Sequence, residues 1–201
     1  MIADRPVRPT SQRIGILGGS FNPAHDGHVH IARLALERLA LDQVWWLVSP
    51  QNPLKPFVGM ATFEERFAVA KNAALADLRI VVSDAELYLG THYTAETLPH
   101  IIAEHPNIRF VWIMGADNLA QMAAWRDWSY ILRTVLVAVF DRPTYSLLAL
   151  SGKTARRFAR SRVPERRGSV LTRRRPPAWV FHHTLLNPVS ATQIRKRNKA
   201  L

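Results

Sequence analysis

Short apolar runs alternate along this chain with longer stretches in which apolar residues recur every three or four positions. The runs predict buried strands and the periodic stretches predict helices. The predicted strands are 14–17, 44–48, 78–82, 109–114, 134–140 and 179–185. The predicted helices cover 29–36 (beginning near His25), 62–76, 94–104, 117–133 in two pieces, and the C-terminal segment. Repeated strand–helix units predict an α/β fold, with a doubly wound parallel sheet in one domain.

Composition agrees with one folded domain. The chain has 201 residues, 48% of them hydrophobic, and no cysteine, which excludes disulfides and a thiol nucleophile. The N-terminus lacks the apolar stretch of a signal peptide, and no apolar run is long enough to span a bilayer. We therefore expect a soluble, cytoplasmic protein with a flexible extension over 1–12 and one domain over 13–201.

The net charge of +12 is concentrated in one segment. Residues 151–177 contain ten lysines and arginines and a single acid, Glu165. A single basic insertion favours a solvated, partly mobile loop over a nucleic-acid surface. An electrostatic lure for anionic nucleotides is a second interpretation, and RNA binding is a remote third. The oligomeric state stays open between a monomer and a homo-oligomer.

Residues 18–28, GGSFNPAHDGH, connect the first predicted strand to its helix. Gly18 and Gly19 have no Cβ, so a phosphate could approach the main chain, although a tight turn would also use them. His25 and His28 share a face if the helix begins near His25. No third metal ligand follows at a familiar spacing, so the pair predicts phosphate contacts and not a metal site. Backbone N–H groups at a helix N-terminus attract anions as well.

A second candidate segment lies near the C-terminus, where residues 189–195 read VSATQIR. Ser190 is a plausible helix N-cap. The exposed amides, the Thr192 hydroxyl and the Arg195 guanidinium could together hold a polyphosphate. The alternative is an ordinary capped terminal helix.

These two segments resemble the paired signatures of the HxGH nucleotidyltransferase superfamily, G-G-[ST]-F-[DN]-P-x-H-x-G-H and I-S-[SA]-T-x-I-R, in the same order. The resemblance implies a Rossmann-like fold and transfer of a nucleotidyl group from a nucleoside triphosphate to a phosphate acceptor. It implies that the ATP site includes Gly18, Gly19, Ser20, Phe21, His28, Ser190, Thr192 and Arg195.

Residues that follow the other strands extend this resemblance, because the carboxyl ends of parallel strands share one crevice. The segment 50–56 resembles the P-x-x-P-x-K loop of nicotinate mononucleotide adenylyltransferases, in which Lys55 would serve the acceptor phosphate, and Asn22 would join the acceptor site. Residues 92–98, HYTAETL, resemble a [ST]-Y-T-x-[DE]-T-L segment, although His92 departs from it. Main-chain groups around Thr94 would accept the pyridine carboxylate. In physical terms Thr94 is a helix cap.

After the fourth predicted strand, Gly115 and Asp117 resemble the family's G-x-D-x-L segment, which is followed by a tryptophan. Asp117 would bind ribose or adenine-side groups, or cap the next helix. Trp125 would stack on the pyridine ring, and the amide of Arg126 would contact its carboxylate.

The implied reaction transfers AMP from ATP to nicotinate mononucleotide and releases pyrophosphate, in NAD biosynthesis. His25, His28, Lys55 and Arg195 would stabilise charge on the phosphates, and no protein nucleophile is required. The implied cofactor is Mg²⁺ bridging the substrate phosphates, with no dedicated protein metal site. Two alternatives stay open: nicotinamide mononucleotide as preferred acceptor, or an RNA-binding protein on an inactive scaffold.

Overall fold

The computed structural model describes residues 11–50, 59–142 and 144–183. They form a sheet of seven strands in which every neighbouring pair is parallel. The strands are β1 (Gln12–Gly19), β2 (Gln43–Val48), β3 (Ile80–Ser83), β4 (Ile108–Gly115), β5 (Leu136–Phe140), β6 (Arg162–Val163) and β7 (Trp179–His182). The predicted α/β fold is therefore confirmed, and each predicted strand is present with its ends shifted by a few residues.

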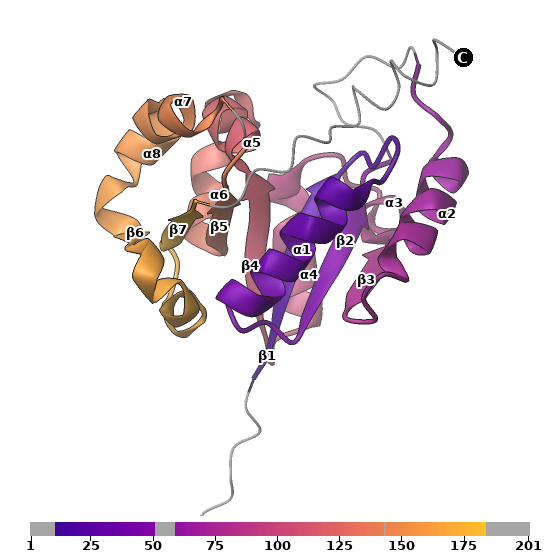
Figure 1. Ribbon diagram of the computed structural model, residues 1–201, viewed down its shortest axis with the longest axis horizontal. Coiled ribbons are helices and arrows are strands. Elements are labelled where there is room, and N and C mark those ends of the chain that lie inside the picture. The colour runs from indigo at the N-terminus through magenta and orange to yellow at the C-terminus, as the bar shows by residue number, and fades with distance from the viewer. Residues whose placement is uncertain (1–10, 51–58, 143, 184–201) are drawn as a thin grey trace, which may run out of the picture.

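The strand order is β3-β2-β1-β4-β5-β7-β6, so the chain winds outwards from β1 in one direction and then returns to β4 on its other side (Figure 1). The order reverses between β1 and β4. Ligands of doubly wound sheets bind outside the carboxyl ends of the strands at such a reversal. The fold thus places the end of β1, with its glycines and histidines, at the expected binding crevice.

Helices cover both faces of the sheet (Figure 1). One face carries α1 (Asp26–Arg38) and α2 (Phe63–Ala74). The other carries α4 (Thr94–Glu104), α5 (Ala116–Gln121), α6 (Trp128–Thr134), α7 (Ser146–Ser151) and α8 (Lys153–Arg157). The short α3 (Ala85–Leu89) follows β3, and η1 (Met122–Ala124) joins α5 to the Trp125 loop. No helix in the described ranges is long and apolar enough to cross a membrane.

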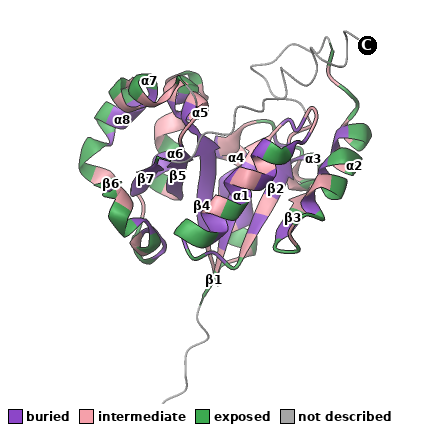
Figure 2. Cartoon of the chain, in the orientation of Figure 1, coloured by how far each residue is buried: buried purple, intermediate pink, exposed green. Residues whose placement is uncertain are grey.

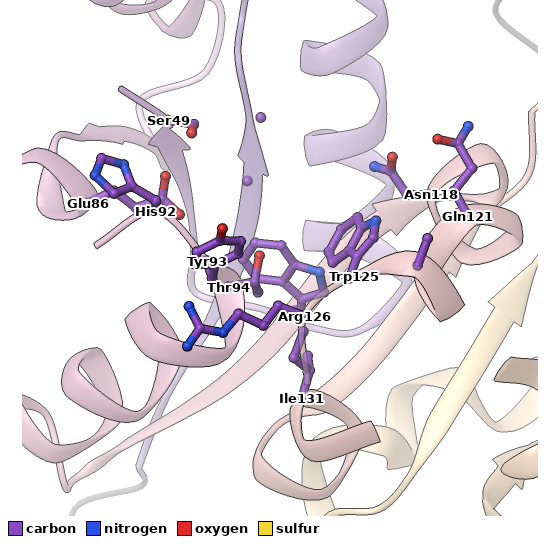
Figure 3. A pocket seen from close by; sticks show the side chains of 14 residues that line it. Ser49, Glu86, His92, Tyr93, Thr94, Asn118, Gln121, Trp125, Arg126 and Ile131 are labelled. Atoms are coloured by element: carbon purple, nitrogen blue, oxygen red, sulfur yellow. The ribbon is translucent and has the colours of Figure 1, made fainter. Parts of the chain in front are cut away.

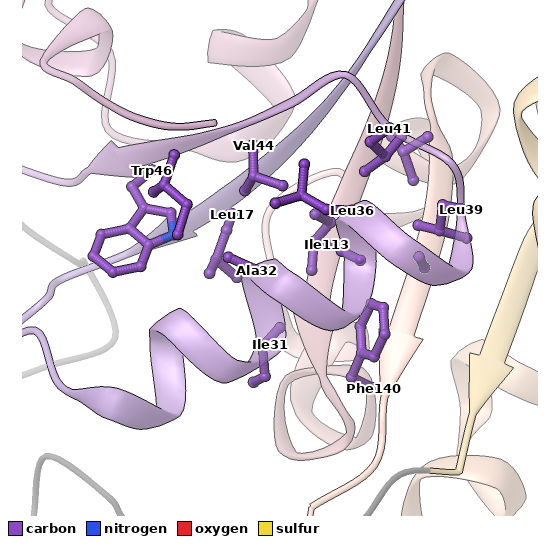
Figure 4. Close-up of a cluster of buried hydrophobic side chains, with 14 of the residues drawn as sticks. Leu17, Ile31, Ala32, Leu36, Leu39, Leu41, Val44, Trp46, Ile113 and Phe140 are labelled. Atoms are coloured by element: carbon purple, nitrogen blue, oxygen red, sulfur yellow. The ribbon is translucent and has the colours of Figure 1, made fainter. Parts of the chain in front are cut away.

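Burial explains why these elements form. The central strands are buried along most of their length, whereas the helices expose one side (Figure 2). On α1, Ala32 and Leu36 pack on the strands near Val44 and Ile113 (Figure 4). Helix α2 begins at a capping box, in which the side chains of Thr62 and Glu65 each bond the main chain of the other.

The arginine-rich segment differs from the sequence-based expectation of a loop. It forms α8, η2 (Ala159–Ser161), β6 and η3 (Glu165–Arg173) at the end of the sheet opposite β3 (Figure 1). Phe158, Val163 and Leu171 are buried in the core, and the ten basic side chains are all exposed. The number of charges does not predict this folded arrangement, because the few buried apolar residues that pack the segment are widely spaced among the arginines.

Leu171 provides a test of this packing. The residue is 0% exposed, so Leu171→Ala should lower the free energy of unfolding by about 2–5 kcal/mol through lost burial and a cavity. The neighbouring exposed Arg173→Ala should change it by less than about 0.5 kcal/mol. Urea unfolding of both variants measures the difference, and equal small effects would mean that the segment does not pack as described.

Candidate active site

His25 and His28 cap the first helix for each other. His25 is the N-cap residue of α1, and its Nδ1 accepts a hydrogen bond from the Gly27 main-chain N–H at 3.1 Å. In return, the His25 main-chain N–H donates to Nδ1 of His28 at 3.2 Å. The ring centroids lie 3.9 Å apart. The expected start of the helix near His25, with both imidazoles on one face, is confirmed.

This reciprocal cap fixes the tautomer of both rings. A main-chain N–H can only donate, so each Nδ1 must be the unprotonated acceptor nitrogen. The proton of the neutral ring then sits on Nε2, and each neutral imidazole has an Nε2–H donor. Burial, followed by the charge of Arg142, lowers the pKa of His25 from 6.5 to about 4, with Asp26 acting weakly in the opposite direction. His25 is therefore neutral near pH 7, which lets Nδ1 accept the Gly27 N–H while Nε2–H stays a donor.

The glycines before the histidines differ in their roles. A Cβ on Gly18 would lie 2.3 Å from the Trp112 indole, so packing against Trp112 accounts for this glycine. At Gly19 a Cβ would meet only ordinary contacts with Phe21, the nearest at 3.5 Å. Close approach of a phosphate therefore stays a prediction for Gly19, whereas at Gly18 the missing Cβ makes room for a tryptophan. Both glycines line the pocket described below.

Phe21 and Asn22 support the loop. Phe21 is 2% exposed, with its ring 4.7 Å from that of His28 and 5.1 Å from that of Trp46. Its φ of +46° is uncommon for a bulky residue and is held by this packing. The Asn22 side chain donates to the Gly59 carbonyl and accepts from the Ala61 N–H, both at 3.3 Å. Neighbouring Ser20 is 4% exposed. These residues support the loop that leads to the histidines and bond it to the main chain of residues 59–61.

Three of the predicted acceptor residues, Thr94, Trp125 and Arg126, come together in a pocket of about 480 Å³ (Figure 3). Asn22 and His25 are not among the residues that line it. Its walls include Gly18, Gly19, Glu86, His92, Tyr93, Thr94, Trp112, Trp125 and Arg126. Nη1 of Arg126 pairs with Glu96 at 3.0 Å, and its guanidinium lies over the Tyr93 ring at 4.8 Å. Thr94 is the first residue of α4 and Tyr93 is the N-cap residue, so the expected cap at Thr94 is wrong by one position.

The end of β4 contributes an ion pair. Gly115 is the N-cap residue of α5, and Asp117 lies in the first turn, so the alternative of Asp117 as N-cap is wrong. Asp117 Oδ2 instead accepts from Arg142 Nη1 at 3.1 Å. A Cβ at Gly115 would lie 2.4 Å from Asp117 Oδ1, so the glycine makes room for this carboxylate. Lys55, Ser190, Thr192 and Arg195 lie outside the described residues.

Three residues of this region were missed by sequence reasoning. Arg142 follows β5 by two positions and lowers the pKa of His25, and a search of all strand ends for cations could have found it. Glu86 is 6% exposed at the pocket wall, three positions after the end of β3. Arg66 stands on the apolar face of α2 between Phe63 and Ala70, a break in the pattern that could have marked it.

The described residues contain no group of three or more histidine, cysteine, aspartate or glutamate side chains that could hold a metal ion. This donor set fits a cation held mainly by substrate phosphates and water, and not one held by a protein cage.

Comparison with known proteins assigns the chain to a class and then to a family. Residues 16–197 match the family model described as cytidylyltransferase-like, which makes the chain a nucleotidyltransferase by class. It is 48% identical to a Methylorubrum extorquens protein named "Probable nicotinate-nucleotide adenylyltransferase", over 92% of this chain and 100% of that protein. A Parvibaculum lavamentivorans protein of the same name is 45% identical, over 98% of this chain and 97% of its own. The chain belongs to the nicotinate-nucleotide adenylyltransferase family.

Among solved structures, the chain is similar in fold to Plasmodium falciparum nicotinic acid mononucleotide adenylyltransferase complexed with NaAD. The TM-score is 0.68 at 16% sequence identity, covering 92% of this chain and 83% of that one. At this identity the likeness supports the fold.

Glu86, in the pocket wall, makes the folding stability of the protein depend on pH. Burial raises the pKa of its carboxyl from 4.5 to about 7, against the opposing hydrogen bonds from Ser49 and Thr97. The folded state therefore keeps a proton that the unfolded chain releases, and stability falls as pH rises from about 4.5 to about 7. Glu86→Gln should remove this loss and gain on the order of 2 kcal/mol over the wild type near pH 8, with little difference near pH 4.5.

Urea unfolding across this pH range tests the prediction, with the exposed Glu104→Gln on α4 as the matched control. Parallel pH profiles for Glu86→Gln and the wild type would contradict it.

Proposed function

We propose that this chain transfers the adenylyl group of ATP to nicotinate mononucleotide, giving nicotinate adenine dinucleotide and pyrophosphate in NAD biosynthesis. The reciprocal cap of His25 and His28 carries the proposal, because each Nδ1 accepts a main-chain N–H and each neutral ring then carries an Nε2–H donor just after β1. Family membership supports the same reaction, since relatives 44–49% identical to this chain bear the name of this activity.

An oxygen of the acceptor's 5′-phosphate attacks the α-phosphorus of ATP in line. The bond from the α-phosphorus to the α,β-bridging oxygen breaks, and its electron pair leaves with pyrophosphate. His25 and His28 donate to α- and β-phosphate oxygens as negative charge moves onto the leaving group. Neither imidazole can be the nucleophile while its Nδ1 accepts a main-chain N–H and its Nε2 carries the proton.

The remaining predicted residues take supporting roles in this proposal. The Gly19 main chain and the Ser20–Phe21 turn face the nucleotide, and Asp117 accepts from its ribose or adenine side, held in place by Arg142. Ser190, Thr192 and Arg195 hold the β- and γ-phosphates, and Lys55 serves the acceptor phosphate; these four roles rest on the sequence resemblance alone. When bound, Mg²⁺ neutralises the phosphate charge.

The pyridine pocket supports nicotinate mononucleotide as the acceptor. Trp125, Thr94 and Arg126 share it. The Arg126 guanidinium is paired with Glu96, which leaves the Arg126 main-chain amide as the group proposed to contact the carboxylate. An acid is recognised by main-chain N–H donors and by nearby positive charge, which an amide uses less well. A cytoplasmic location stays a prediction, and the oligomeric state stays open between a monomer and a homo-oligomer.

Pyrophosphate release tests the reaction and its acceptor together. With ATP and Mg²⁺, we expect fast release with nicotinate mononucleotide and slow release with nicotinamide mononucleotide. Preference for the amide would keep the phosphate chemistry and overturn the roles of Thr94, Trp125 and Arg126. No release with either acceptor would overturn the proposal; salt-dependent RNA binding that is lost when the arginines of 151–177 are replaced would then favour an RNA-binding function.

A variant at His28 separates the cap from catalysis. In His28→Asn the side-chain oxygen can replace Nδ1 as acceptor for the His25 N–H, but no donor stands in the place of Nε2. We expect kcat to fall by about 10²–10³-fold or more, with a melting temperature near that of the wild type. His30→Ala on the same helix is the control and should retain activity. A His28→Asn enzyme with a near-normal rate would remove this histidine from the mechanism.

A further inference from the structure

Arg66 is a buried cation beside the binding edge for which the proposed mechanism gives no role. The residue lies in the first half of α2 and is 2% exposed. Its guanidinium lies 5.6 Å from the centroid of the Phe63 ring. No carboxylate of the described residues forms an ion pair with Arg66. Burial lowers the pKa of its guanidinium, with the charge of Glu64 acting in the opposite direction.

All three nitrogens of the Arg66 guanidinium donate hydrogen bonds to main-chain carbonyls. Nη1 donates to the carbonyls of Ser20 and Ser49, both at 2.7 Å, and Nη2 donates to the Pro50 carbonyl at 2.8 Å. Nε donates to the Ala61 carbonyl at 3.1 Å. Ser20 directly follows β1, whereas Ser49 and Pro50 directly follow β2. One side chain therefore joins the carboxyl ends of two neighbouring strands.

The two joined ends carry different parts of the proposed site. The chain leaving β1 at Ser20 leads through Phe21 and Asn22 to the paired histidines. The chain leaving β2 at Ser49 borders the pyridine pocket, and its Ser49 N–H also bonds the Gly19 carbonyl at 2.9 Å. The spacing between the donors to ATP and the acceptor pocket therefore depends on how these two ends are held together.

We propose that Arg66 is a positioning residue that locks the main chain after β1 to the main chain after β2, and so fixes the ATP and acceptor subsites relative to each other. The inference rests on the proposed function for the identity of the substrates. A planar guanidinium with fixed donor directions suits this role, because it serves carbonyls from several segments at once. A buried cation without a carboxylate partner is costly to a fold, so an apolar residue would serve a purely structural role better.

Arg66→Lys is the sharpest test, because lysine keeps the charge but not the planar set of donors. We expect KM for both nicotinate mononucleotide and ATP to rise at least about 10-fold, while circular dichroism shows the folded fraction unchanged. Arg66→Met should raise both constants at least as much. Lys71→Met, which removes an exposed cation from the same helix, should leave KM and kcat at wild-type values.

A merely structural role gives a different pattern. Fewer folded molecules would lower the apparent kcat in proportion and leave KM unchanged. That pattern, wild-type constants in Arg66→Lys, or loss of the folded state in both Arg66 variants would each overturn the proposal.

ATP titration calorimetry keeps this test separate from the proposed function. A wild-type enzyme that binds ATP but does not turn over nicotinate mononucleotide would contradict the proposed function alone. Arg66→Lys should still bind ATP at least about 10-fold more weakly than the wild type in that case. Equal ATP affinity in the two proteins would count against the positioning role whatever the acceptor is.

Discussion

The reciprocal cap between His25 and His28 is the interaction on which the rest of the site depends. Two hydrogen bonds, from Gly27 N–H to His25 Nδ1 and from His25 N–H to His28 Nδ1, start the first helix and orient both rings. The same bonds leave the proton on Nε2. Local helix chemistry thus determines the donor state of the site, and burial keeps His25 neutral by lowering its pKa to about 4.

The sheet places this cap where it can act. Because the strand order reverses between β1 and β4, the ends of these strands open onto one crevice. The cap follows β1, and the Asp117–Arg142 pair joins the ends of β4 and β5. The pocket lined by Thr94 and Trp125 also includes both glycines at the end of β1. Arg66 donates to main-chain carbonyls that directly follow β1 and β2. Main-chain groups therefore take part in both the cap and the Arg66 contacts.

The sequence predicted the fold and the location of the site because both follow from periodic patterns. Alternating apolar runs gave the strands, and the GGSFNPAHDGH segment fell at the first strand–helix junction as expected. Tertiary contacts were not predictable in the same way. Gly18 makes room for the side chain of Trp112, which lies far along the chain on β4. The Arg66 guanidinium donates to main-chain carbonyls 16, 17 and 46 residues away. The folded arginine-rich segment was missed because four buried apolar residues, Ala155, Phe158, Val163 and Leu171, and not its charge, decide its packing.

The central claim is that the two imidazoles stabilise charge as Nε2–H donors and never form a bond to phosphorus. The stereochemical course at the α-phosphorus tests this directly. With one diastereomer of ATP carrying sulfur at the α-phosphorus, a single in-line attack by nicotinate mononucleotide predicts inversion of configuration in the dinucleotide product. Retention would require two successive displacements through a covalent adenylyl-enzyme, and it would contradict the account.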